Sequence, residues 1–357
     1  MSQLNFRLIS YIIGLLLLFN STAIFLTSFV SYYFSDGFFS SMLKSGFICF
    51  AIGFLIMFFS KNPKKIINRR DGYLVVVIGW LTMVFSGMLP YIFTNTIDNV
   101  PDLIFETMSG YTTTGSSIIS DIEALPESII FWRSMTHWLG GMGIIVLAIA
   151  ILPMLGIGGM QLFSAEAPGS GISGDKIHPR ISNTAKRLWF IYFGLTLLET
   201  LLLNIAGMSF FDAINHSMSN IATGGFSTKN DSLSFWNSMP QIQYIIIFFM
   251  ILAGTNFLLI YLSLIGKFKK LFYNTEFIWF LGLIASFVLV TTVILYSNVE
   301  LDSTNFSHPQ VLGKLEASFR HALFQVVAII TTTGFVTGDF AAWTPFLTML
   351  FFGLMFI

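Results

Sequence analysis

The chain carries apolar stretches that are each about as long as a membrane is thick. A helix needs about 20 mostly apolar residues to cross the hydrocarbon core of a bilayer. Stretches near that length recur at 8–33, 42–59, 73–93, 129–155, 188–208, 241–265, 277–296 and 341–357. Hydrophobic residues make up 55% of the 357 residues and charged residues 10%, whereas soluble domains carry roughly 25% charge. The sequence therefore predicts an all-α polytopic membrane protein.

The first apolar stretch, 8–33, is too long for the core of a signal peptide and has no small-residue cleavage site, so we expect a retained helix. The charges then orient the spans. With the N-terminus inside, most basic residues fall on the inner face: Arg7, Lys61, Lys64, Lys65, Arg69, Arg70, Lys176, Arg180, Lys186, Arg187, Lys267, Lys269 and Lys270. The outer face holds Lys44, Arg133, Lys229, Lys314 and Arg320. The positive-inside rule therefore predicts a cytoplasmic N-terminus.

The acidic residues show the reverse distribution. The following carboxylates fall on the outer face: Asp98, Asp102, Glu106, Asp121, Glu123, Glu127, Asp231, Glu300 and Asp302. A negatively charged mouth attracts cations by raising their local concentration. We expect Glu106 and the other external carboxylates to supply this attraction without supplying specificity.

Three short segments share a threonine and glycine pattern and lie between two predicted spans. They are Thr-Thr-Thr-Gly at 112–115, Ala-Thr-Gly-Gly-Phe at 222–226 and Thr-Thr-Thr-Gly-Phe at 331–335. The stretches before them, 103–111, 212–221 and 315–330, are too apolar for solvent and mostly too short to span. Non-helical backbone at membrane depth is tolerated only where it lines a cavity or is buried in protein. The sequence thus predicts repeated units of helix, re-entrant pore loop and helix.

Aligning the three copies on their glycines places Glu106, His216 and Gln325 at one equivalent position, nine residues before the glycine. A polar side chain recurs there in an apolar background. A half-helix that enters from outside also points its carbonyl end at the membrane centre, where the negative end of its dipole stabilises a cation.

The pattern has a physical reason if the segments form a potassium filter. Such a filter replaces the water shell of the ion with rings of backbone carbonyls, supplied by several related units. Glycine adopts the required backbone angles without the penalty that a side chain imposes, so glycine substitutions are the ones expected to be severe. We predict that K⁺ is coordinated at Thr113, Thr114, Gly115, Thr223, Gly224, Gly225, Thr332, Thr333 and Gly334, and we refer to these three sets as the filter triplets.

Further segments match a pattern known from one family: His-Trp-Leu-Gly-Gly-Met-Gly-Ile at 137–144, Gly-Met-Gln-Leu-Phe-Ser-Ala-Glu-Ala-Pro-Gly at 159–169, His-Pro-Arg-Ile at 178–181, and the residues at 221–227 and 324–327. With the filter triplets, they resemble the Trk/Ktr/HKT superfamily of potassium transporters, and within it the TrkH-type membrane subunit. The resemblance runs the length of the chain.

The resemblance implies four consecutive pore repeats that each give one glycine to a four-part filter, preceded by an extra helix pair. We expect the extra pair and a basic cytoplasmic loop at 1–70, repeat one at 71–160, a cytoplasmic loop at 161–187, repeat two at 188–270 and an incomplete repeat three at 271–357. The glycine-rich gating loop of repeat three and the arginine of repeat four, which the family carries, would lie past Ile357. We therefore expect the sequence to be truncated at its C-terminus.

The resemblance also implies potassium uptake across the plasma membrane of a prokaryote, with no organic cofactor. It implies a homodimer in membrane lipid and a cytosolic TrkA-type nucleotide-binding regulatory subunit. Two alternatives stay open: a KtrB-like sodium-dependent potassium transporter, against which the extra helix pair argues, and a non-conducting truncated interaction subunit. The sequence does not choose between channel-like conduction and coupling to H⁺ or Na⁺.

Other chemistries find little support, and we expect neither an enzyme nor a nucleic-acid partner. The G-x-G-x-x-G pattern at 169–174 follows a membrane span where a dinucleotide fingerprint would follow a strand, and Asp175 separates Gly174 from Lys176 where a phosphate loop needs adjacent residues. The histidines, at 137, 178, 216, 308 and 321, lack the i, i+4 spacing of a metal site. Glu199 stays open: an acid within a span is by default a functional hypothesis, or it pairs with polar groups near Thr196 or Asn204.

Overall fold

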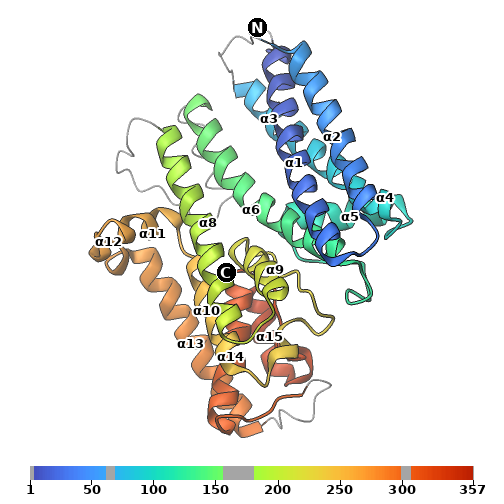
Figure 1. Cartoon of the computed structure of the whole chain (residues 1–357). Helices are drawn as coiled ribbons and strands as arrows, with labels where there is room; N and C mark the ends of the chain where they lie inside the picture. Colours follow the sequence, from blue (N-terminus) through green and yellow to red (C-terminus); the bar gives the residue numbers. More distant parts are fainter. Residues whose placement is uncertain (1–3, 62–68, 156–180, 299–306, 357) are drawn as a thin grey trace. The chain divides into compact units, whose positions relative to one another are not determined.

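The computed structural model describes residues 4–61, 69–155, 181–298 and 307–356. Within these ranges the regular structure is helical and no strand occurs (Figure 1). The chain divides into two compact units. The first comprises the described residues up to 112, with 116–155 and 181–186; the second comprises 113–115 and the described residues from 187 on. The all-α fold expected from the sequence is confirmed.

The first unit begins with an antiparallel helix pair, α1 (Phe6–Phe34) and α2 (Phe39–Phe59), whose helices lie side by side in Figure 1. Their backbones approach closely at two glycines: a Cβ on Gly14 would lie 2.9 Å from the carbonyl oxygen of Gly53, and a Cβ on Gly53 would lie 3.0 Å from that of Gly14. Small residues at such crossings let two helices pack tightly in a membrane. Helix α1 packs further onto α3 (Arg69–Gly87) and α6 (Glu127–Leu155).

The turn of this helix pair also stabilises the start of α6. Asp36 accepts hydrogen bonds from the backbone N–H of Ser128 at 3.0 Å and of Phe38 at 3.1 Å, and from the hydroxyl of Ser31. Burial of Asp36 opposes its charge, but the bonds from Ser128, Ser31 and Phe38 outweigh it and hold the pKa of the carboxyl below its usual value. A residue 92 positions away thus caps α6.

Between α3 and α6 lie α4 (Leu89–Thr94) and the first pore helix, α5 (Val100–Tyr111). The second unit contains α8 (Ile181–Ile205, from residue 187 on), the second pore helix α9 (Phe210–Ile221), η1 (Ser232–Trp236), α10 (Pro240–Ala253), α11 (Phe257–Leu264), α12 (Phe268–Phe272), α13 (Thr275–Asn298), the third pore helix α14 (Lys314–Ile330), η3 (Phe340–Ala342) and α15 (Pro345–Leu354). Its core centres on α14, which packs against α10 and α13 and buries Phe324, Val326 and Val327.

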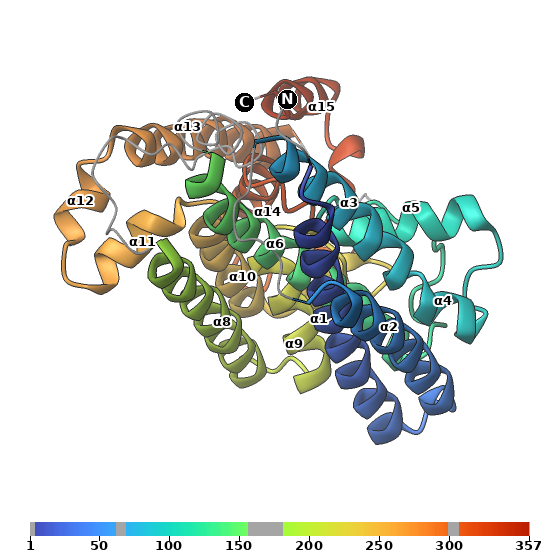
Figure 2. The same cartoon turned by 90° about the horizontal axis from the view of Figure 1, so that it is seen from above.

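The observed helices lie where apolar length predicted them, with two exceptions. Five helices of the described residues are long and apolar enough to cross a membrane, or six if α10 and α11 form one span. The stretch 241–265, expected as one helix, forms two helices, because α10 and α11 meet at 102° (Figure 2). Gly254 ends α10 against the side chain of Thr331, where a Cβ would come within 2.7 Å of Cγ2, and Asn256 caps α11. The last stretch forms only the ten residues of α15.

The motif at 159–169 and the glycine-rich pattern at 169–174 lie outside the described residues. The division into five segments given above stays a prediction.

Candidate ion-conduction site

The three pore helices end in the same backbone geometry. The last residues of α5, α9 and α14 are followed by Thr112, Ala222 and Thr331, whose φ angles are −79°, −78° and −86°. The next residue takes a left-handed φ in every copy: 55° at Thr113, 53° at Thr223 and 57° at Thr332. The filter glycines are also left-handed, with φ of 76° at Gly115, 81° at Gly225 and 76° at Gly334. The filter triplets are thus repeats in conformation as well as in sequence.

The left-handed threonines were not foreseen, because sequence reasoning gave the unusual backbone angles to glycine alone. A β-branched residue in this region is a genuine outlier, and such strain costs about 1–3 kcal/mol per residue and gathers at functional sites. The shared motif for ending a helix explains the angle. A Schellman motif places a left-handed residue, usually glycine, directly after the helix.

Repeats two and three complete this motif with two hydrogen bonds each. The N–H of Thr223 donates to Asn220 and that of Gly224 to Ser219, both at 2.8 Å. The N–H of Thr332 donates to Ile329 at 3.0 Å and that of Thr333 to Ala328 at 2.9 Å. The amides of the triplets are therefore turned back to the pore helix, and these bonds leave the carbonyls of the same residues available.

The triplets meet one another through a repeated contact inside the second unit, to which 113–115 belong. A Cβ on Gly115 would lie 1.9 Å from the carbonyl oxygen of Gly224. A Cβ on Gly225 would lie 2.1 Å from the carbonyl oxygen of Thr333. Both contacts join the glycine of one triplet to the residue before the glycine of the next. A Cβ on Gly334 would meet no described atom within 4 Å. The same contact therefore places the first triplet next to the second and the second next to the third.

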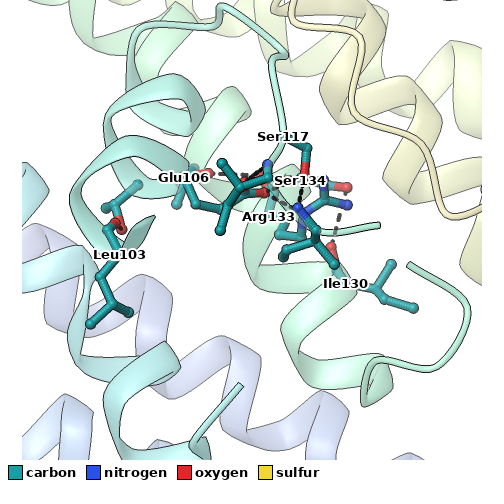
Figure 3. Close-up of polar contacts among 10 residues, drawn as sticks. Leu103, Glu106, Ser117, Ile130, Arg133 and Ser134 are labelled. Carbon is teal, nitrogen blue, oxygen red and sulfur yellow. Dashed lines mark hydrogen bonds and ion pairs between the residues drawn. The ribbon is translucent and has the colours of Figure 1, made fainter. Parts of the chain in front are cut away.

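A buried ion pair supports the backbone that follows the first triplet (Figure 3). Glu106 of α5 is 0% exposed and Arg133 of α6 is 1% exposed, and Nε of Arg133 lies 2.9 Å from Oε1 of Glu106. The hydroxyl of Ser117, two residues after Gly115, lies 3.0 Å from both carboxylate oxygens, and Nη2 of Arg133 donates to it at 3.0 Å. The N–H of Ile118 also donates to Glu106. Pore helix, post-filter backbone and α6 are thereby joined at one point.

The second repeat makes the equivalent connection with neutral groups. His216 and Ser227 occupy the positions of Glu106 and Ser117, and Nε2 of His216 lies 3.0 Å from the hydroxyl of Ser227. Nδ1 of His216 bonds the backbone oxygen of Asp212 at 2.8 Å, which fixes the ring.

The third repeat departs from this arrangement. The residue equivalent to Ser117 and Ser227 is Val336, which has no hydroxyl. Oε1 of Gln325 is buried and has no hydrogen-bond partner in the part of the chain that the structure describes. The post-filter backbone is instead reached by His321, whose Nδ1 lies 2.8 Å from the hydroxyl of Thr337.

These contacts correct the role expected for Glu106. The sequence suggested an external carboxylate that attracts cations, but its charge is enclosed and compensated by Arg133. Glu106 supports the loop; it is not part of a negatively charged mouth. The expectation failed because the positive-inside count assigned Arg133 and Glu106 to the same side without placing them in contact.

Helix α1 of the N-terminal pair also contacts the first pore helix. No sequence motif predicted this contact. The hydroxyl of Tyr111, the last residue of α5, donates to Oδ1 of Asn20 at 2.7 Å, and Nδ2 of Asn20 donates to Ser86 at 2.8 Å. Gly87 leaves room for the tyrosine ring, and Gly140 for its carbonyl oxygen, which a Cβ would approach to 1.9 Å. The one available signal was an asparagine in the middle of an apolar span.

Glu199 pairs with a polar group on a neighbouring helix, as one of its two interpretations expected, but the partner is neither Thr196 nor Asn204. Thr196 bonds the backbone oxygen of Tyr192 at 2.9 Å, and Asn204 bonds that of Met208 at 3.1 Å. Nδ2 of Asn220, near the end of α9, instead donates to Oε1 of Glu199 at 2.6 Å. The acid therefore contacts the second pore helix next to its filter triplet.

The family model described as TrkH, a cation transport protein, matches residues 39–357. The chain belongs to the TrkH family. Trk system potassium uptake protein TrkH of Salmonella typhimurium is 39% identical over 356 residues, which cover 99% of this chain and 71% of that protein. Trk system potassium uptake protein TrkG of Escherichia coli is 32% identical over 298 residues, covering 83% of this chain and 59% of that protein.

A solved structure agrees with the TrkH assignment in fold. The crystal structure of the potassium transporter TrkH from Vibrio parahaemolyticus matches with a TM-score of 0.83 and 35% identity, over 98% of this chain and 70% of that one. The chain is therefore a multi-pass membrane protein of this transporter family, as its apolar helices and pore-loop pattern predicted.

Proposed function

We propose that this TrkH family member is the potassium-uptake membrane subunit of a Trk system, and that K⁺ passes a ring of backbone carbonyls contributed by the filter triplets. Its TrkH relatives are named as potassium uptake proteins. The observation that carries the filter assignment is the repeated contact of Gly115 with the carbonyl of Gly224 and of Gly225 with that of Thr333. In a K⁺ filter, equivalent carbonyls of several related units surround the ion, and we infer that the repeated contact reflects such an arrangement.

The pore helices add a favourable field. Each ends directly before its triplet, at Tyr111, Ile221 and Ile330. The carbonyl end of a helix carries about half a negative elementary charge. Three such ends next to the triplets stabilise a cation without binding it as tightly as carboxylates would, so the ion can leave as well as enter.

The family resemblance supplies the remainder of the ring. Gly334 has the same backbone conformation as Gly115 and Gly225, and no described atom occupies the place where the next carbonyl would lie. We propose that a carbonyl of a fourth segment of the same kind takes that place. The alternative, a non-conducting interaction subunit, predicts no potassium uptake by the protein itself, so an uptake assay distinguishes the two.

Sidedness and assembly belong to the same proposal. The concentration of Lys and Arg in alternate loops supports a cytoplasmic N-terminus in the plasma membrane of a prokaryote. A homodimer and a cytosolic TrkA-type nucleotide-binding subunit are proposed on the family resemblance alone. Co-purification of the chain with a TrkA-type subunit tests the second of these.

The filter assignment is tested by serine substitutions of three left-handed glycines, made in the complete gene product and expressed in cells that lack other potassium uptake. Gly225→Ser drives a Cβ against the carbonyl of Thr333 and should abolish uptake. Gly334→Ser strains the backbone and places a Cβ where we propose that the next carbonyl lies, so the preference for K⁺ over Na⁺ should weaken.

Gly207→Ser is the matched control. Gly207 also has a positive φ, of 107°, but its nearest neighbour is Sδ of Met239 at 3.8 Å, away from the triplets. The Gly207→Ser variant should therefore have the ion preference of the wild type. An unchanged preference in Gly334→Ser, together with normal uptake in Gly225→Ser, would remove the triplets from the conduction path.

A further inference from the structure

The carboxyl of Glu199 and the amide of Asn220 face each other in the interior of the second unit. Both side chains are 0% exposed. Nδ2 of Asn220 donates to Oε1 of Glu199 at 2.6 Å and to the backbone oxygen of Ile246 in α10 at 3.2 Å. The two bonds fix the orientation of the amide, because exchanging its nitrogen and oxygen would place the oxygen against two acceptors.

The other two atoms of this pair lack a donor. Oε2 of Glu199 and Oδ1 of Asn220 are buried and have no hydrogen-bond partner in the described part of the chain. An ionised carboxylate and an amide oxygen are both acceptors only. Leaving a buried polar atom unsatisfied costs about 1–3 kcal/mol, and more for a charged one. A single proton on the carboxyl supplies the missing donor.

The surroundings do not compensate a charge on Glu199. The buried ion pairs of Arg133 with Glu106 and of Arg320 with Glu316 do not include Glu199. Asn220 lies in the last turn of α9, where the helix dipole is negative and opposes a carboxylate.

The titratable groups on the helices around Glu199 are engaged elsewhere. Arg187 lies at the other end of α8, about 18 Å along the helix axis. On α9, both ring nitrogens of His216 are occupied, and Asp212 bonds Ser209 and Thr228. Tyr192 lies nearly two turns earlier on α8, and the phenol of Tyr244 on α10 bonds Glu316.

We propose that Glu199 is an intramembrane proton-binding site: a neutral carboxylic acid whose proton, on Oε2, is donated to Oδ1 of Asn220. The acid and the amide then form a pair joined by two hydrogen bonds, which ties α8 to the end of the second pore helix.

The pair acts on the filter through one residue. The backbone oxygen of Asn220 accepts the N–H of Thr223 at 2.8 Å, the bond that sets the left-handed turn into the second triplet. Glu199 is thus a positioning residue for Thr223. This positioning role rests on the proposed function, whereas the protonation of Glu199 does not.

Infrared spectroscopy of the complete protein in lipid tests the protonation directly. We expect the C=O stretching band of a buried protonated carboxyl between about pH 6 and 8, which Glu199→Gln removes. Glu123→Gln, at an exposed acid, is the control and should leave the band in place. Absence of the band in the wild type would mean that Glu199 is ionised and would overturn the proposal.

Potassium uptake tests the positioning role. Glu199→Gln keeps two hydrogen bonds to Asn220, as an amide pair, and should keep uptake within about twofold of the wild type. Glu199→Leu leaves Oδ1 of Asn220 without a donor and Nδ2 with only the backbone oxygen of Ile246, and should lower uptake by more than about tenfold. The reversed pair, Glu199→Gln with Asn220→Asp, again combines one acid with one amide. It should therefore keep most of the wild-type uptake that Glu199→Leu loses.

A loss of uptake in Glu199→Gln as large as in Glu199→Leu would show that the negative charge itself is needed, as for a bound cation, and would overturn the proposal. The outcome of the glycine substitutions is independent of the outcome of the Glu199 experiments. If Gly225→Ser and Gly334→Ser leave ion preference unchanged, the filter assignment is lost, while the infrared band still reports the proton on Glu199.

Discussion

The loop after the first filter triplet is held by a buried ion pair, whereas the equivalent loop of the second repeat is held by an uncharged histidine. In both, a side chain nine residues before the filter glycine bonds a serine two residues after it: Glu106 with Ser117, and His216 with Ser227. The backbone angles of the two triplets agree within a few degrees. The same backbone can therefore be supported by different chemistry.

The difference lies in what a failure costs. Two charges removed from water are stable only together, so loss of one partner leaves a buried charge uncompensated. A neutral hydrogen bond loses only its own modest contribution. Removing one partner should accordingly destabilise the first repeat more than the second.

The largest effect is expected from Arg133→Leu, which strands the carboxylate of Glu106 at 0% exposure. Breaking a buried pair in this way costs about 3–5 kcal/mol, so the variant should lose folded protein and uptake. The folded fraction is measured by size exclusion after heating. Glu106→Gln combined with Arg133→Met removes both charges and should recover most of the stability. No recovery would mean that the pair is needed for more than mutual compensation.

A matched pair of serine substitutions compares the two repeats at one register position. Ser117→Ala removes bonds to two charged side chains and should lower the free energy of unfolding by about 1.5–3 kcal/mol. Ser227→Ala removes one bond to a neutral imidazole and one to the N–H of Lys229, and should cost about 1 kcal/mol. Thermal unfolding of the two purified variants gives the ranking. Equal losses would contradict the distinction between charged and neutral support.

The smallest effect is expected at Asp36, which stabilises the first repeat from outside the pore. Its pKa is lowered in the folded chain, so its contribution is present above the unfolded value of about 3.9 and is lost as pH falls through the folded value. Asp36→Asn should therefore lower the free energy of unfolding near neutral pH by less than about 1 kcal/mol for a partly exposed group, measured as a lower melting temperature, with the difference from wild type vanishing in acid. A constant difference at all pH values would assign the effect to packing.

The position of the pore helices followed from the sequence because two strong local signals coincided. Apolar stretches too short to span precede each triplet, and the helices α5, α9 and α14 end within one residue of the predicted positions. The break within 241–265 was not predicted, for the converse reason. Apolar composition gives the length of a span, but the bend after Gly254 depends on Thr331, which lies far away in the sequence.

In the candidate site, too, local sequence signals predicted some features, and contacts from distant residues decided the others. The filter glycines were identified as positions that need unusual backbone angles, and their φ values agree. The left-handed threonines, the enclosure of Glu106 by Arg133 and the contact of Glu199 with Asn220 were not identified. Each depends on which helix end or side chain arrives from elsewhere.

Composition, span length and the repeated Thr-Gly pattern by themselves determined the membrane class, the helical fold and the location of the pore loops. Those properties depend on local hydrophobicity and backbone freedom, which the residues carry with them. Only the tertiary structure decided how the triplets contact one another and which buried charges and amides are paired. Inside a low-dielectric interior the state of a carboxylate such as Glu106 or Glu199 depends on its neighbours, and those neighbours come from other helices.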